Sequence, residues 1–158
     1  MATAAVAALV VRPSTLAKVT LRNGEATGGK KYVIDRVFAH NLVGVANSSY
    51  GIWLCVHPVG MSAVTDDIAA RGSSNGIAYS GNSEFDLAAT VDNDGWFPYG
   101  NAGHAVTVTV PGGQLDVPIE GRIILPPTAG LSVQVVADTT GATFTCGVSW
   151  YELSDGLE

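Results

Sequence analysis

The chain has 158 residues, of which 47% are hydrophobic and 14% charged, so it can bury a core and is too apolar to be disordered. Its formal net charge of −6 argues against nucleic acid as a partner, because phosphate binding needs a clustered basic surface. Soluble domains carry about 25% charged residues, so the shortage favours a subunit partly covered by neighbours over a monomer with a neutral Ser/Thr-rich surface.

The first part of the chain is an apolar run, residues 2–11, with no positive residue before it. A secretory signal peptide carries such a residue, and a bilayer-spanning segment is longer. We therefore expect residues 1–15 to form an N-terminal arm, residues 16–158 to form one domain, and no contact with a membrane.

Charge is distributed unevenly along the chain. Residues 1–36 carry six Lys and Arg against two acids, a net +4, whereas residues 37–158 carry two against twelve, a net −10. A basic leading segment predicts docking onto an acidic surface of its own domain, of a second subunit or of a different protein. A basic first hairpin without any partner role is the equal alternative.

Nine short segments rich in Val, Ile, Thr and aromatic residues, most of them ended by Gly, Pro, Asn or Asp, predict strands. They lie near Leu16–Arg22, Lys31–Asn41, Gly51–Val59, Ser83–Thr90, Ala105–Val110, Gln114–Ile119, Gly121–Leu125, Leu131–Ala137 and Ala142–Leu153. In the last of them Phe144, Cys146, Val148 and Trp150 alternate with Thr145, Gly147, Ser149 and Tyr151. One buried face per strand indicates antiparallel sheets stacked as a sandwich.

The connections between these strands distinguish among three all-β architectures. Asn23-Gly24 and Gly28-Gly29 predict hairpin turns through positive φ. Ser62–Arg71 could form one or two helical turns, and residues 72–82 and 92–103 are expected to be surface loops. Long middle connections, and the lack of a Cys…Trp…Cys framework, favour a jelly-roll sandwich over an immunoglobulin-like sandwich or a closed barrel.

Three segments superficially match nucleophile or acid motifs of hydrolases. Gly72–Gly76 fits G-x-S-x-G with Ser74, but no strand precedes it and no helix follows it. Cys146–Trp150 lies near the C-terminus with no histidine after it, and Asp138–Gly141 reads as a turn. We expect no catalytic residue and no enzyme activity, with a hydrolase that uses Ser74 as the hypothesis we expect to fail.

No segment carries the spacing of a metal site. Asp92–Gly95 resembles the start of a calcium loop but lacks the later ligands, so a β-turn is expected. His40, His57 and His104 flank different strands, and a zinc site would need the fold to gather them. The prediction is therefore no metal and no cofactor.

The cysteines and one aromatic run leave alternatives open. Cys55 and Cys146 each lie in an apolar stretch, either as buried thiols or as one disulfide between neighbouring strands. The run Trp96–Tyr99 either closes one end of the sandwich, contacts another subunit or presents aromatic rings to a sugar.

The C-terminal third resembles a known family. The step Ile124-Leu125-Pro126-Pro127 precedes a Val-rich strand, and Phe144–Glu152 closes the chain with Val148-Ser149-Trp150. These runs, with Tyr32–His40 earlier, resemble the strands of small jelly-roll virion proteins of tailed bacteriophages. The resemblance implies a capsid decoration or cement protein, a head spike or a tail-tip protein, and supplies no functional residues.

The resemblance leads to a specific functional expectation. We expect a non-enzymatic decoration or cement protein on the virion surface, made in the host cytoplasm, whose partners are itself, as a homotrimer or another closed oligomer, and a major capsid protein. The alternative is a carbohydrate- or receptor-binding module on a tail or spike, where a glycan would be the ligand. The candidate interface residues are Val6, Leu9, Val10, Val11, Arg12, Lys18, Arg22, Trp96, Phe97 and Tyr99.

Overall fold

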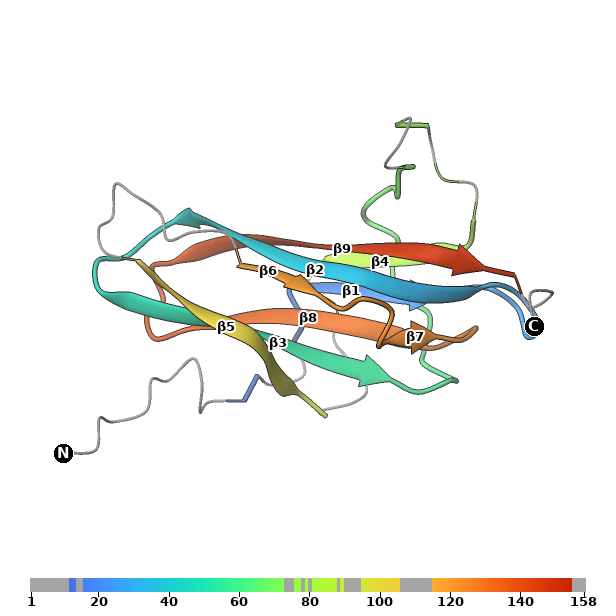
Figure 1. Ribbon diagram of the computed structural model, residues 1–158, viewed down its shortest axis with the longest axis horizontal. Coiled ribbons are helices and arrows are strands. Elements are labelled where there is room, and N and C mark those ends of the chain that lie inside the picture. Colours follow the sequence, from blue (N-terminus) through green and yellow to red (C-terminus); the bar gives the residue numbers. More distant parts are fainter. Residues whose placement is uncertain are drawn as a thin grey trace.

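The protein is a sandwich of two antiparallel β-sheets (Figure 1). The computed structural model describes residues 12–13, 16–72, 76–77, 79, 81–87, 89, 95–105 and 115–154, with the backbone alone for 100–105. The strands are β1 (Val19–Asn23), β2 (Lys31–Val43), β3 (Ser48–His57), β4 (Ser83–Leu87), β5 (Phe97–Ala105), β6 (Leu115–Pro118), β7 (Ile124–Leu125), β8 (Gly130–Ala137) and β9 (Thr143–Leu153). The prediction of an all-β antiparallel fold is confirmed, and the described residues contain no helix that could cross a membrane.

The strand order joins segments that are far apart in sequence. One sheet has the order β4-β1-β8-β3-β5. In the other sheet β2 pairs with β9 along one side and with the short strands β6 and β7 along the other. The chain passes between the sheets after β1, β2, β5, β7 and β8, so most strand neighbours are not consecutive.

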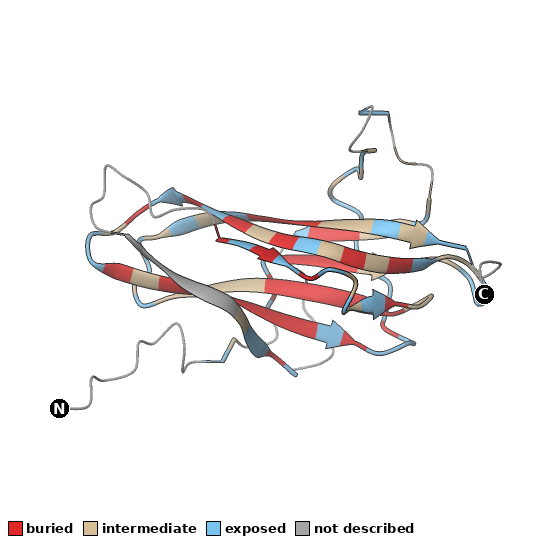
Figure 2. Ribbon diagram, viewed as in Figure 1, coloured by how far each residue is buried: buried red, intermediate tan, exposed pale blue. Residues whose placement is uncertain are grey.

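The core lies between the two sheets, and buried residues occur on strands of both sheets (Figure 2). In β2, Tyr32, Ile34 and Val37 are fully buried, and in β3, Ile52 and Leu54 are fully buried. Burying each of these side chains stabilises the fold by about 1.5–3 kcal/mol relative to leaving it exposed.

Two features differ from the sequence prediction. Residues 97–103, expected to be part of a surface loop, belong to an edge strand, β5, which pairs with β3. Its Pro98 and its glycines weaken the strand signal, but an edge strand tolerates a residue without a backbone N–H. The expected strand Ala105–Val110 lies almost entirely outside the described residues.

The expected helical turns at Ser62–Arg71 are also wrong. This segment runs beside β4 and holds its outer edge: Phe85 N donates to Asp66 Oδ1 (3.0 Å), and Leu87 N donates to Asp67 Oδ2 (3.2 Å). The early aspartates that suggested a helix start instead accept hydrogen bonds from a strand.

The turn after β1 depends on two adjacent residues. Asn23 is fully buried, and its Nδ2 donates to the carbonyls of Lys30 and Leu125 at 2.9 Å each. Gly24 is needed for close approach to the carbonyl of Asn82, whereas Gly28 has the predicted positive φ of 82°.

Candidate functional site

The strand β9 forms one edge of the smaller sheet. Within the described residues its backbone pairs only with β2, over a register from Thr143 to Leu153. In an antiparallel pair about half of the backbone N–H and C=O groups point away from the partner strand. The opposite side of β9 is therefore able to accept a further strand.

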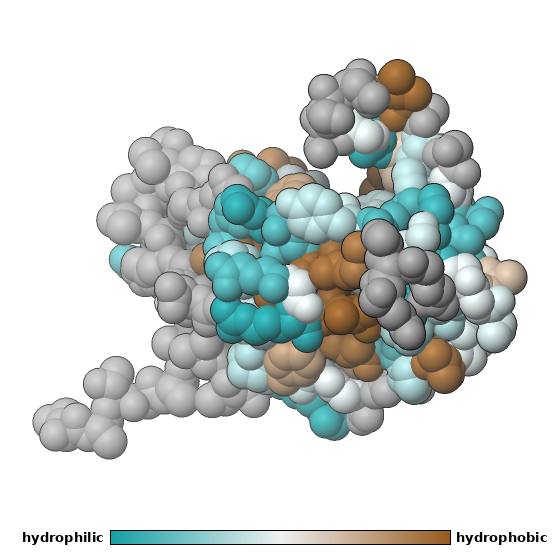
Figure 3. All heavy atoms as spheres, turned by 45° about the vertical axis from the view of Figure 1, so that its right-hand side comes forward, coloured by the Kyte–Doolittle hydropathy of each residue, from teal (hydrophilic) through white to brown (hydrophobic). Residues whose placement is uncertain are grey.

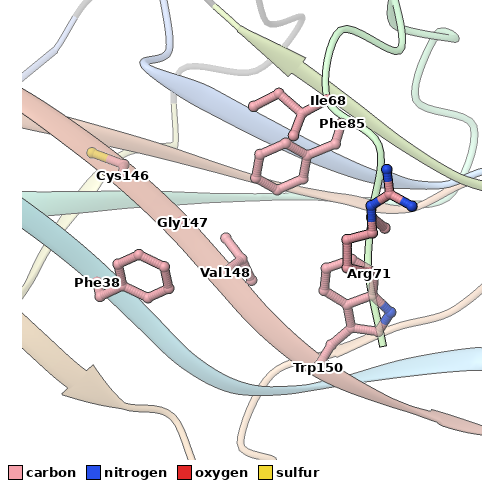
Figure 4. A pocket seen from close by; sticks show the side chains of 9 residues that line it. Phe38, Ile68, Arg71, Phe85, Cys146, Gly147, Val148 and Trp150 are labelled. Carbon is pink, nitrogen blue, oxygen red and sulfur yellow. The ribbon is translucent and has the colours of Figure 1, made fainter. Parts of the chain in front are cut away.

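A groove of about 240 Å³ runs along this edge (Figure 4). The view shows Ile68 and Phe85 on one side of β9 and Phe38 on the other. Among the described residues that line the groove, Arg71 is the one that carries a charge. The groove is lined by Phe38, Ile68, Ala70, Arg71, Phe85, Cys146, Gly147, Val148 and Trp150.

The connection between β3 and β4 projects from the sandwich (Figure 1), and its Ile68, Ala70 and Arg71 line the groove. Tyr79 packs edge-on against Trp150, with ring centroids 6.0 Å apart. Its hydroxyl donates to the Tyr32 hydroxyl at 3.1 Å, and the Tyr32 ring stacks on Trp150 at 5.8 Å. Burial raises the pKa of Tyr32, so its hydroxyl stays protonated near neutral pH. This cluster fixes the loop over the end of β9.

The groove contains no poised nucleophile among its described residues. Cys146 is buried, and that burial raises the pKa of its thiol to about 12. The reactive form of cysteine is the thiolate, which this thiol does not reach at neutral pH. The chemistry of the groove is therefore apolar binding beside a strand edge.

Much of the basic leading segment docks onto the chain's own acidic body. Arg22 Nη1 lies 2.7 Å from Glu84 Oε1, and its Nε donates to the Met61 carbonyl. Arg36 Nη1 lies 2.7 Å from Asp116 Oδ2. Arg22 is therefore mainly an internal residue rather than part of an outer surface, since 12% of its side chain is exposed.

A third ion pair follows the same pattern. Lys30 Nζ lies 2.7 Å from Glu152 Oε2, and this hydrogen bond raises the pKa of Lys30. The sequence left open whether the basic segment docks onto its own domain, a second subunit or a different protein. In these three ion pairs the acidic partner belongs to the same domain.

The other predicted interface residues of the N-terminal region are placed only in part. Val6, Leu9, Val10 and Val11 lie outside the described residues. Arg12 and Lys18 are exposed.

The three candidate aromatic residues do not form one platform. Trp96 is 5% exposed and packs with Trp53 and Cys55 on the outer face of the larger sheet. Phe97 is 37% exposed, and its ring meets Tyr99 edge-on with centroids 6.0 Å apart. Trp96 is thus a packing residue, and Phe97 is the more accessible of the three.

The remaining motif candidates are dispersed or outside the described residues. Ser74 and Asp92–Asp94 are outside them. His40 is exposed on β2, whereas His57 is buried on β3 of the other sheet. No group of three or more His, Cys, Asp or Glu among the described side chains could hold a metal ion.

A hydrogen-bonded cluster of buried polar side chains on the outer face of the larger sheet was not predicted from the sequence. His57 Nε2 lies 2.8 Å from Ser132 Oγ, which lies 2.8 Å from Thr20 Oγ1, and all three residues are at most 2% exposed. The signal was available: the run Gly51–Val59 is apolar apart from His57, a pattern typical of strands buried on both faces. Neither cysteine forms a disulfide; Cys55 lies beside this polar cluster and Cys146 lies in the core.

Comparisons with protein-family models, with curated proteins and with solved structures found no match. The resemblance to bacteriophage virion proteins therefore remains a prediction based on the quoted runs.

Proposed function

We propose that this chain is a non-enzymatic decoration protein that binds the outer shell of a bacteriophage capsid. The observation that carries the proposal is a row of apolar side chains across the outer face of the smaller sheet. Tyr151 of β9 and Ile124 of β7 both pair with Val33 of β2, and they are 63% and 51% exposed. Large exposed apolar side chains in a continuous row mark a surface that a partner covers.

Charged residues surround this row. In the turn after β6, Arg122 Nη2 lies 3.0 Å from Glu120 Oε2. The ion pair of Lys30 and Glu152 lies at the start of β2. Figure 3 shows hydrophobic surface between hydrophilic side chains toward this end of the molecule. An apolar centre with a polar rim is typical of protein–protein interfaces.

The strand order supports a jelly-roll type of sandwich. The first strand β1 lies between β4 and the penultimate strand β8, and β3 follows β8 in the same sheet. Such non-sequential neighbours arise when the chain passes repeatedly between two sheets, as in Greek-key sandwiches.

The test is co-sedimentation with undecorated capsid shells of a host phage. The wild-type protein is expected to bind, and Tyr151→Asp and Ile124→Asp to reduce binding at least tenfold, because each places a carboxylate in the contact. Val59→Asp is the matched control, since Val59 is 61% exposed in the turn after β3 of the other sheet. Binding that is equal for all three variants would contradict the proposal.

The second candidate function is glycan or receptor binding through the edge of β5. The exposed Phe97 ring and its contact with Tyr99 favour it, because exposed rings stack on sugars. Phe97→Ala is expected to abolish binding on a glycan array while leaving the fold intact, with Leu42→Ala, at an exposed residue of β2 in the other sheet, as control. A blank array and unchanged host adsorption would remove this candidate.

A further inference from the structure

We propose that the groove along β9 binds the apolar N-terminal segment, residues 2–11, of a second copy of this chain as an added strand. The inference rests on the proposed function, which it deepens by naming the surface through which copies join one another.

The edge of β9 differs from the other sheet edges within the described residues. The edge of β4 is held by Asp66 and Asp67, and β5 carries Pro98. The opposite edge of the smaller sheet consists of strands of four and two residues, and β6 ends at Pro118. Short strands, prolines and covering segments are the usual protection against unwanted strand pairing.

By contrast, β9 has eleven residues, no proline, and Glu152 as its one charged residue. The described backbone shows no bulge within β9 itself, because the extra residues at both register shifts are on β2. The β3–β4 loop lies over the Trp150 end of this edge; the remainder, bordered by the apolar groove, is suited to accept an extended peptide by strand addition.

The N-terminal segment has the chemistry that this groove requires. Its sequence, Ala-Thr-Ala-Ala-Val-Ala-Ala-Leu-Val-Val, contains no charge and no proline. Its side chains are mostly small, which suits a groove of about 240 Å³, below the range of about 300–1,000 Å³ for pockets that hold drug-sized ligands. Ten extended residues span about 33 Å, which exceeds the stretch of about 17 Å from Cys146 to Trp150 that lines the groove.

The position where the described chain begins favours a second copy over the same chain. Arg12, Pro13 and Leu16 line a hollow with residues 134–137 of β8, in the larger sheet. The groove belongs to β9 in the other sheet, about 10 Å away, and β1 separates β8 from the β4 edge. To reach β9 of its own molecule, the segment would have to cross from β8 past β1 and β4 to the other sheet. That distance takes about six residues at about 3.3 Å each, which leaves too few of residues 2–11 to pair along β9.

Strand donation of this kind is directional. Each copy donates its N-terminal segment and accepts another, so the contact is heterologous and closes into a ring when the rotation permits. A closed trimer would satisfy the groove and the N-terminal segment of every copy.

The test compares matched variants of the full-length chain by native mass measurement. Ala70 lines the groove, whereas its neighbour Ala69 is exposed and does not. Ala70→Trp fills the groove and is expected to give a monomer of 16.2 kDa, as is the double variant Leu9→Asp/Val11→Asp. Ala69→Trp is expected to keep the oligomeric mass of the wild type.

A second measurement uses a labelled peptide of residues 1–12. The Leu9→Asp/Val11→Asp variant, whose grooves are empty, is expected to bind this peptide, and adding Ala70→Trp to weaken binding at least tenfold. A monomeric wild type that binds no peptide, or equal behaviour of Ala69→Trp and Ala70→Trp, would overturn the inference. Capsid binding is measured separately. If the protein decorates shells but binds no peptide, the inference fails and the proposed function stands. If the protein binds the peptide but does not decorate shells, the proposed function fails and the inference stands.

Discussion

The phenyl ring of Phe38 on β2 occupies the space in which a Cβ of its register partner, Gly147 on β9, would lie. Both residues are on the outer face of the smaller sheet, where a glycine exposes backbone and weakens the strand. The ring covers that backbone, so the pair restores packing at the centre of the longest strand pairing in the molecule.

We expect Gly147→Val to destabilise the protein by about 1–2 kcal/mol, although valine is ordinarily favoured in strands. The new side chain displaces the Phe38 ring and exposes the backbone that the ring covers. Urea unfolding measures the change, with Thr145→Val on the same exposed face of β9 as the control. The double variant Phe38→Ala/Gly147→Val is expected to be more stable than the sum of the single changes predicts. Simple additivity would contradict the packing argument.

Asn23 predicts a large effect at a single polar residue. Asn23→Ala leaves the buried carbonyl of Leu125 and the partly buried carbonyl of Lys30 without their side-chain donor. We expect a loss of about 2–4 kcal/mol in the free energy of unfolding, since each unsatisfied buried group costs about 1–3 kcal/mol. Asn82→Ala is the control, because that side chain bonds Glu25 at an exposed position and its removal is expected to cost less than about 0.5 kcal/mol.

The thiols give a prediction about reactivity. Cys55 is fully buried and Cys146 is 9% exposed, and neither forms a disulfide. With the pKa of Cys146 raised to about 12, on the order of one thiol in ten thousand is ionised at pH 8. A thiol-specific reagent is therefore expected to modify neither residue until the protein unfolds. Thr145→Cys places a thiol at the exposed neighbouring position and should react at once; similar rates for Cys146 would show that β9 separates from the core.

The sequence predicted what local alternation determines and missed what long-range pairing determines. Phe144, Cys146 and Val148 were correctly assigned to one inward face, because that face follows from the period of two along a strand. The groove beside them was not predictable, since it exists only because β2 and β9, about one hundred residues apart, leave β9 at an edge. No local pattern states which strand of a sheet is outermost.

The errors have the same origin. Asp66 and Asp67 suit a helix start as well as a strand edge, and only the neighbouring β4 decides between them. Likewise Pro98 excludes a central strand but not an edge strand. The apolar row of Val33 and Ile124 required knowledge of register, because each residue alone reads as an ordinary strand residue.

Asp86 provides a prediction about pH. Asp86 is 9% exposed. Its Oδ2 accepts a hydrogen bond from Thr65 N at 3.0 Å, and Asp67 lies close by. Burial, and to a lesser degree the charge of Asp67, raises the pKa of Asp86 above its ordinary value. The folded state therefore prefers the protonated carboxyl. Its contribution to stability is fully present below the ordinary pKa, near 4, and is lost as the pH rises through the folded-state value.

We therefore expect Asp86→Asn to raise the free energy of unfolding at pH 7. The amide oxygen still accepts the Thr65 N–H, whereas the desolvated negative charge is removed. The gain over the wild type should shrink as the pH falls toward 4, because the wild-type carboxyl then becomes neutral as well. Asp67→Asn is the control and should give a smaller gain, since it removes only the neighbouring charge. Urea unfolding at several pH values measures both, and a gain for Asp86→Asn that does not change with pH would show that ionisation of this carboxyl does not oppose folding.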